Sequence, residues 1–164
     1  MKQQIADIVK IKKIREESAF NEMKRREQIL EQATKKVEEK EKELLDYQEW
    51  RIKEENRLYN NILKKKVYVK DIDSLKLEII HNKEQEQDYV KARDDALQEK
   101  ENAHDAYMDS KKDYSQAVIN TEKTGEILTV VTEEEAFEAE RTEEGEMEEQ
   151  ATSVSIGPRE EWEN

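Results

Sequence analysis

The first 124 residues of this 164-residue chain contain neither glycine nor proline; all three glycines and the single proline come later. Average usage would place about fifteen such residues in a stretch of that length. Compact domains need them for turns, whereas a few very long helices do not. The sequence therefore predicts an elongated all-α structure, of the kind that holds or connects other molecules more often than it catalyses.

Cysteine is also absent, which excludes disulfides and thiolate metal sites. The longest apolar runs, such as Val67–Val69, have three residues, far below the roughly 20 needed to cross a bilayer. The N-terminus lacks the apolar stretch of a signal peptide. We expect a cytoplasmic protein that does not insert into the membrane.

Apolar residues make up only 34% of the chain and charged residues 43%, which is too little apolar surface for one compact core. Long helices need only a narrow apolar seam. The net charge of −13 is concentrated after Gly125, where fourteen glutamates face two arginines, whereas residues 1–26 hold eight basic and four acidic residues. No aromatic stacking pattern accompanies that basic end, so nucleic-acid binding is not expected.

A heptad seam runs from Ile5 to about Leu63, which is typical of a left-handed coiled coil. One column consists of Val9, Met23, Leu30, Val37, Leu44 and Leu58, and the other of Ile5, Ala19, Ala33 and Tyr47. Charged residues interrupt the columns at Glu16, Arg26, Lys40 and Arg51. A further strip, formed by Ile8, Ile11 and Ile14, widens the apolar face, so we expect this end to meet something else.

The periodicity fails between Lys64 and Asp71, where three lysines precede residues that favour extended backbone. We predict a bend here, with Asp71 or Ser74 capping a new helix. A second seam follows, with the columns Ile72, Ile79, Tyr107, Tyr114 and Leu75, Tyr89, Ala96, Ala103, Ala117. Glu86, Arg93 and Lys100 interrupt its first column.

Two long helices with a short connection are antiparallel neighbours. With the bend near residue 67, the numbers of facing residues should add up to about 134. This register pairs Val37 with Leu97, Leu44 with Val90 and Ile62 with Ile72. It also brings Lys40 close to Asp94, and Arg26 close to Asp109.

The predicted fold is thus a long antiparallel two-helix coiled-coil hairpin over residues 1–124, with a helix at about 4–64, a bend at about 65–71 and a helix at about 72–122. Residues 125–164 form an acidic tail that we expect to be mostly disordered. Within it, Ile127, Val130, Val131 and Phe137 either extend the second helix by a few turns or form a short separate helix.

The most distinctive local string runs from Tyr47 to Tyr59. In a helix, Trp50, Glu54 and Arg57 share one face, whereas Tyr47, Arg51 and Leu58 lie on another. Two interpretations stay open: a stiff helix with an aromatic rim near the turn, or a docking patch, because Trp, Tyr and Arg are enriched at binding hot spots.

The pattern Tyr47-x-x-Trp50-Arg51-x-x-Glu54-Glu55-x-Arg57-Leu58, followed by Lys70-Asp71-Ile72 and a second long helix, resembles the YscO-type proteins of bacterial type III secretion, which are related to flagellar FliJ. The resemblance is clearest over residues 45–90 and is compatible in pattern over 1–125. It implies an antiparallel coiled-coil stalk at the cytoplasmic base of the secretion apparatus. Such a stalk links a hexameric export ATPase to the export gate protein and handles secretion chaperones and the needle-length ruler protein.

By this analogy the end that carries the termini enters the ATPase ring. Charge and position then assign to ATPase contact the basic residues Lys10, Lys12, Lys13, Arg15, Lys24, Arg25 and Arg26, although a solvated helix face explains each lysine equally well. The resemblance assigns to gate, ruler or chaperone contact the residues Tyr47, Trp50, Arg51, Glu54, Glu55, Arg57 and Leu58.

An enzymatic function is not expected. His81 and His104 lie on one predicted helix about 35 Å apart, too far for a dyad or a shared metal. No glycine-rich phosphate loop is present, so any ATP chemistry belongs to a partner. We predict no catalytic residues, no metal and no cofactor.

Two other functions remain open. In the first, the chain is an escort that binds helical segments of chaperones through the Trp50 face, which could be a second role of the same stalk. In the second, the chain is an unrelated coiled-coil scaffold or tether that homodimerises through the same seams. A self-contained hairpin would be monomeric, which is the state that the seams favour.

Overall fold

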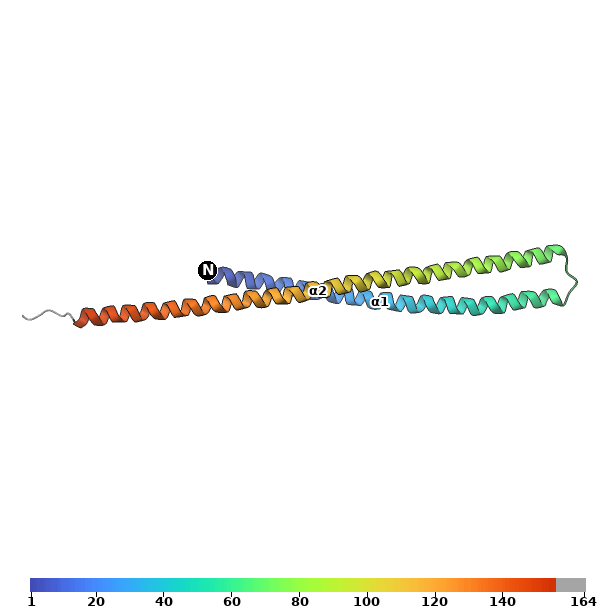
Figure 1. Cartoon of the computed structure of the whole chain (residues 1–164). Coiled ribbons are helices and arrows are strands. Elements are labelled where there is room, and N and C mark those ends of the chain that lie inside the picture. The colour runs from blue at the N-terminus through green and yellow to red at the C-terminus, as the bar shows by residue number, and fades with distance from the viewer. Residues whose placement is uncertain (156–164) are drawn as a thin grey trace, which may run out of the picture. The chain divides into compact units, whose positions relative to one another are not determined.

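The computed structural model describes residues 1–155, which form two helices: α1, Lys2–Leu63, and α2, Val69–Ser155. The two helices are joined by a five-residue connection at 64–68 and contain no strand between them. The predicted all-α fold of two long antiparallel helices packed against each other is confirmed (Figure 1).

Asp71 fixes where the second helix begins. Its Oδ2 accepts a hydrogen bond from Tyr68 N at 3.0 Å, and its own N donates to Tyr68 O, also at 3.0 Å. This is a reciprocal cap, in which an acidic residue of the first turn reaches back to the residue before the helix. The predicted capping role of Asp71 is confirmed. Because the cap reaches back from Asp71, α2 starts at Val69 and not at about residue 72 as predicted.

Contact analysis divides the chain into a central unit, Phe20–Asp113, and a terminal unit that combines Met1–Ala19 with the chain from Tyr114 onward. In the central unit, the buried apolar residues are Val37, Leu44, Leu75 and Ala96, all of which lie in the predicted columns. The predicted register also holds there: Gln48 contacts Glu86, whose numbers add up to 134, and Lys36 contacts Glu99, which add up to 135.

At two of the predicted residue pairs, the packing differs from the prediction. Leu97, expected opposite Val37, is 40% exposed, whereas the neighbouring Ala96 is only 1% exposed and occupies the core. Ile72 is exposed, so its predicted pairing with Ile62, next to the connection between the helices, does not bury it. Small residues allow the helices to approach closely where a leucine would hold them apart.

The charged core positions mostly pair within their own helix. Lys40 Nζ contacts Glu43 Oε2 at 3.2 Å instead of Asp94, and Arg26 Nε contacts Glu22 Oε1 at 2.9 Å instead of Asp109. The two predicted cross-helix pairs were therefore wrong. Carboxylates three or four residues away along the helix were already within reach, so no partner from the other helix was needed.

In the terminal unit, Val9 is buried and half-buried residues come from both helices. The half-buried residues include Ile5, Ala19, Tyr114, Leu128 and Val131. This inward face continues the predicted seam of α1 and extends that of α2 beyond Val118, the last residue of the predicted second seam.

The second helix continues to Ser155, whereas the sequence predicts that helix ends at about residue 122 and disorder follows. Glu, Ala, Met and Gln are good helix formers, and both Gly125 and Gly145 have helical backbone. The hydroxyls of Thr129, Thr142 and Thr152 each donate to the carbonyl four residues earlier. The rest of the predicted tail, residues 156–164, lies outside the described residues.

Candidate partner-binding surface

Tyr47 points inward, toward α2. Its ring stacks on Tyr89 with centroids 4.6 Å apart, and its hydroxyl donates to the backbone oxygen of Asn82 at 2.7 Å. Burial, reinforced by Tyr89 and the negative charge of Glu86, raises the pKa of the Tyr47 hydroxyl. Tyr47 thus stays neutral and joins the two helices of the central unit.

Arg51 is also committed to the interior, where its side chain is 19% exposed. Its Nη1 donates to Glu55 Oε1 at 2.9 Å within α1, and its Nε meets Glu86 Oε2 across the helices at 2.5 Å, as an ion pair without hydrogen-bond geometry. Gln48 Nε2 donates to the other oxygen of Glu86 at 3.1 Å. Two residues that interrupt the apolar columns, one from each helix, therefore neutralise each other. This pairing leaves Arg51 and Glu55 little capacity for contacts with another protein.

Trp50 faces outward and is 47% exposed, with its ring centroid 5.4 Å from that of Tyr47. It borders an open groove of about 490 Å³ between α1 and α2. The groove is lined by Trp50, Glu54, Arg57 and Leu58 from α1 and by Leu77, Glu78, His81 and Asn82 from α2. An exposed indole beside an exposed Leu77 gives this groove an apolar wall that water covers in the free chain.

A bidentate ion pair forms the polar rim of the groove. Arg57 donates from Nε to Glu54 Oε2 at 3.0 Å and from Nη2 to Glu54 Oε1 at 2.5 Å. The hydrogen bonds from Arg57 lower the pKa of Glu54, and those to Glu54 raise the pKa of Arg57. Both groups are charged near neutral pH, so the rim offers one acceptor and one donor beside the apolar wall.

The structure therefore divides the assigned string by role. It brings Trp50, Glu54, Arg57 and Leu58 together in the groove, and it places Tyr47, Arg51 and Glu55 in internal contacts. Sequence reasoning missed the contribution of Leu77, Glu78, His81 and Asn82. The register could have found them, because residues 76–84 are those whose numbers add up to about 134 with residues 50–58.

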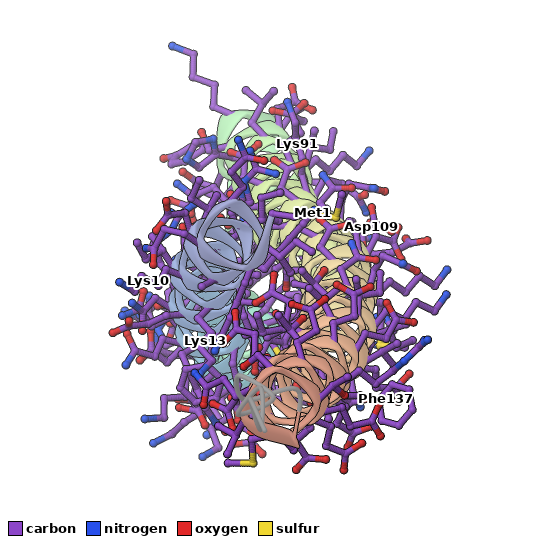
Figure 2. The ribbon with its side chains drawn as sticks, turned by 90° about the vertical axis from the view of Figure 1, so that its left-hand side faces the viewer. Met1, Lys10, Lys13, Lys91, Asp109 and Phe137 are labelled. Carbon is purple, nitrogen blue, oxygen red and sulfur yellow. The ribbon has the colours of Figure 1, made fainter. Side chains whose placement is uncertain are left out.

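The basic residues of α1 fall into two groups. Lys10, Lys13 and Arg15 are exposed and Lys12 is half-buried; Figure 2 shows Lys10 and Lys13 on the outer side of α1. Within the described residues none of these four forms an ion pair. This group belongs to the terminal unit and remains available to an anionic partner.

The second basic group, in the central unit, is already neutralised. Arg25 and Arg26 both contact Glu22, at 2.6 and 2.9 Å, and Lys24 contacts Glu27 at 3.2 Å. The hydrogen bonds from Arg25 and then Arg26 lower the pKa of Glu22 to about 2. Lys24, Arg25 and Arg26 are therefore weaker candidates for an ATPase contact than Lys10, Lys13 and Arg15.

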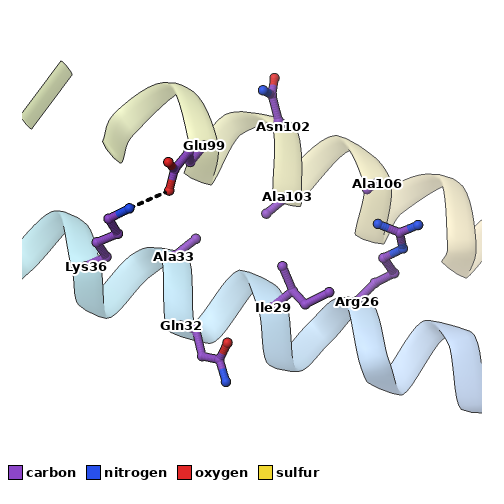
Figure 3. A pocket seen from close by; sticks show the side chains of 9 residues that line it. All are labelled: Arg26, Ile29, Gln32, Ala33, Lys36, Glu99, Asn102, Ala103 and Ala106. Atoms are coloured by element: carbon purple, nitrogen blue, oxygen red, sulfur yellow. Dashed lines mark hydrogen bonds and ion pairs between the residues drawn. The ribbon is translucent and has the colours of Figure 1, made fainter. Parts of the chain in front are cut away.

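A second hollow of about 470 Å³ lies between the helices where small residues face each other. Ala33, Ala103 and Ala106 leave it open, and the ion pair of Lys36 Nζ with Glu99 Oε2, at 3.0 Å, closes one side (Figure 3). Its walls carry no serine, threonine, cysteine or histidine. We interpret this hollow as a stretch of the coiled coil where small side chains leave the helix interface loosely packed, and not as a catalytic site.

The histidines do not come together: His81 contacts Gln85 at the groove, and His104 lies 3.8 Å from Asp105 on the same helix. Among residues 1–155, no three His, Asp or Glu side chains are grouped so that they could hold a metal ion. Neither of the two helices described has a stretch that is apolar enough to cross a membrane.

Fold and surface together define a two-helix coiled-coil protein whose most distinctive surface feature is the open groove beside Trp50. The family model of the type III secretion protein YscO matches residues 5–153, so the chain belongs to that family. A crystal structure of type III secretion protein YscO from Vibrio parahaemolyticus is similar, with a TM-score of 0.85 and 24% identity over 90% of this chain and 93% of that one. Comparison with curated protein sequences gives no match.

Proposed function

We propose that this chain is the central stalk of a type III export ATPase, coupling the hexameric ATPase to the export gate at the cytoplasmic base of the apparatus. Membership of the YscO family carries this proposal. The two-helix fold supports it, because a coiled coil can transmit position and torque while each helix satisfies its own backbone. Family membership also removes the alternative of an unrelated scaffold.

The ATPase contact is assigned to Lys10, Lys12, Lys13 and Arg15. Lys10, Lys13 and Arg15 are exposed and Lys12 is half-buried, and none of them would have to break an ion pair of the described residues to bind a carboxylate surface. Charges on the rim of an interface act mainly on the association rate and its salt dependence. We therefore expect the contact to weaken as salt is raised.

The Trp50 groove is assigned to the second contact, with the gate, the ruler protein or a secretion chaperone. Of the seven residues suggested by the motif, Trp50, Glu54, Arg57 and Leu58 line the groove and carry this role. Tyr47, Arg51 and Glu55 hold the helices in the arrangement that forms it. An apolar centre with an Arg–Glu rim is the composition found at binding hot spots.

The direct test is copurification with the hexameric ATPase, followed by ATP hydrolysis with and without this chain. Binding and stimulated hydrolysis are expected for the natural chain. The triple variant Lys10→Glu, Lys13→Glu, Arg15→Glu should lose both. The control Lys35→Glu, Lys42→Glu, Lys91→Glu makes the same charge change at exposed lysines of the central unit and should retain both. Equal loss in the two variants would refute the assignment to residues 10–15.

An escort function is favoured by the exposure of Trp50. Trp50→Ala should abolish pull-down of secretion chaperones and leave ATPase stimulation intact. Tyr59→Ala is the matched control, because Tyr59 is 49% exposed and lies outside the groove. If Trp50→Ala instead abolishes stimulation with chaperone binding unchanged, the groove serves the ATPase and the escort function is wrong.

A further inference from the structure

The last part of the described α2 buries none of its side chains between Glu133 and Val154. Every residue from Glu133 to Val154 is exposed, although the segment is helical throughout. Most helical stability in proteins comes from packing of one face, which this segment lacks, and glutamates four residues apart, such as Glu140 and Glu144, destabilise it. The segment would gain stability from a surface that covers it.

This segment is not polar on all sides. Phe137, Met147 and Val154 are 61%, 69% and 80% exposed, and their spacing places them along one side of the helix. Ile127 and Val130 extend the strip toward the paired part of α2. Within the strip, Val130 and Phe137 point away from the inward-facing residues Leu128 and Val131. Figure 2 shows Phe137 on the outer side of α2. We call these five residues the acidic-helix strip, because ten glutamates and one arginine lie between residues 133 and 154.

The first helix of the same unit carries a strip of opposite charge. Ile8, Ile11 and Ile14 are all exposed, with Ile14 at 66%, although Val9 between them is buried. By helical spacing, Arg15 lies between Ile8 and Ile11 and Lys10 lies next to Ile14, whereas Lys13 lies on the opposite side of α1. None of these three cations has an ion pair of its own within the described residues. We call this the basic-helix strip. It faces away from the seam, so α2 of the same chain cannot cover it.

We propose that the two strips meet between two copies of this chain, the acidic-helix strip of each copy packing on the basic-helix strip of the other. A two-fold axis generates both contacts together, because the acidic-helix strip of the first copy meets the basic-helix strip of the second, and the reverse. The charges are complementary, and each strip offers exposed apolar side chains to the other. The lengths also match, because residues 133–154 extend for about 33 Å and residues 1–19 for about 28 Å at 1.5 Å per residue.

A second copy fits better than other occupants. An anionic membrane surface would suit Lys10 and Lys13 but would be repelled by the glutamates of the same unit. The acidic segment cannot fold back on its own α1, since α2 runs unbroken through Gly125 and Gly145. The seams are used up within one hairpin and therefore favour a monomer. The two strips lie outside the seams, so they can pair two hairpins without opening either one.

Such a dimer would be a reversible store of the protein. It covers the side of α1 that carries the isoleucines and Arg15, so a dimeric chain could not use Arg15 on the ATPase; this consequence rests on the proposed function. The dimer itself does not depend on the proposed function, and the experiment that tests it contains no ATPase. Its failure is therefore distinguishable from failure of the stalk function.

Analytical ultracentrifugation of the full chain from 5 to 200 μM tests the proposal. In 50 mM salt, the mass should rise with concentration from 19.5 kDa toward twice that value. In 500 mM salt, the dissociation constant should rise at least tenfold, because salt screens exposed charges. A chain that remains monomeric at 200 μM in 50 mM salt overturns the proposal.

Two variants without charge change locate the contact. Ile11→Ser and Phe137→Ser should each weaken the dimer at least tenfold, and circular dichroism should show that both remain helical. Leu45→Ser, at an exposed leucine of the central unit, is the control and should leave the dimer unchanged. A dimer that survives both Ile11→Ser and Phe137→Ser uses another surface, such as exchanged seams, and contradicts the proposal.

The absence of cysteine makes a final check simple. When the separate variants Ile11→Cys and Phe137→Cys are mixed and oxidised, the mixed disulfide should form in preference to either homodimer. Formation of the Phe137→Cys homodimer alone would show that the acidic segments pair with each other, and would also overturn the proposal.

Discussion

Single side chains in the Tyr47–Leu58 string do two different things. Tyr47 and Arg51 connect the helices through Asn82, Tyr89 and Glu86. Trp50 turns the other way and leaves its ring to the solvent. A hot-spot composition therefore does not by itself identify a docking surface, because the same residue types also build the interior of a thin coiled coil.

The Tyr47 hydroxyl gives a first prediction. Tyr47→Phe removes the 2.7 Å hydrogen bond to Asn82 O and keeps the ring stacked on Tyr89. Loss of one partly buried hydrogen bond should reduce the free energy of unfolding by about 1 kcal/mol. Thermal or denaturant unfolding measures it, with Tyr59→Phe at an exposed site as control. Equal stability of Tyr47→Phe and the natural chain would mean that the stack alone joins the helices here.

Glu22 gives a prediction about acid. Its pKa is lowered from 4.5 to about 2 by the hydrogen bonds from Arg25 and Arg26. A carboxylate with a lowered folded-state pKa stabilises the fold above its unfolded value, and this contribution disappears as the pH falls toward 2. The melting temperature should therefore drop between pH 4.5 and 2, and less steeply in Glu22→Gln. Glu38→Gln, at an exposed glutamate, should follow the natural chain. Identical slopes for Glu22→Gln and the natural chain would contradict the role of this ion pair.

At the scale of elements, the seven-residue columns determine most of what is buried. Every buried apolar residue of the described chain lies in one of the four predicted columns. The buried polar residues Asn82 and Ser110 were not predicted, although the same seven-residue spacing places both in line with Leu75. The sequence could not give the partners of charged core residues. For Lys40 and Arg26 a carboxylate on the same helix was closer, whereas for Arg51 the partner came from α2.

The end of α2 shows that amino-acid composition alone does not distinguish a disordered segment from an exposed helix. A Glu-rich segment with few apolar residues satisfies the usual criteria for disorder, yet the same residues have high helix propensity. The groove was missed for a related reason. Leu77 and His81 carry no motif of their own, and only the register places them beside Trp50.

Substitution of the two glycines within α2 tests whether this helix is continuous and unpacked where they lie. An added Cβ meets nothing within 4 Å at either Gly125 or Gly145, and both have helical backbone. Gly125→Ala, in the paired part of the helix, should raise the free energy of unfolding by about 0.5–1 kcal/mol. Gly145→Ala lies in the fully exposed segment and should increase helicity at 222 nm with little change in the unfolding of the hairpin. A loss of stability in Gly125→Ala would show that a partner occupies the space beside it.

At the scale of the whole molecule, the chain doubles back at residues 64–68 and its two helices pair antiparallel. The seam, the Trp50 groove and the proposed roles all depend on this arrangement. Family membership agrees with it, and the similar crystal structure shares the fold over nine-tenths of the chain.

The most direct measurement is the distance between two spin labels on cysteines introduced at Glu43 and Lys91, which are both exposed in the central unit and whose numbers add up to 134. Since the natural chain has no cysteine, only these two sites are labelled. In the antiparallel hairpin the labels lie across one helix pair, and pulsed electron paramagnetic resonance should give a distance below about 25 Å, allowing for two helix radii and the label arms. One unbroken helix would instead hold them about 72 Å apart, and that result would contradict the fold and the functions derived from it.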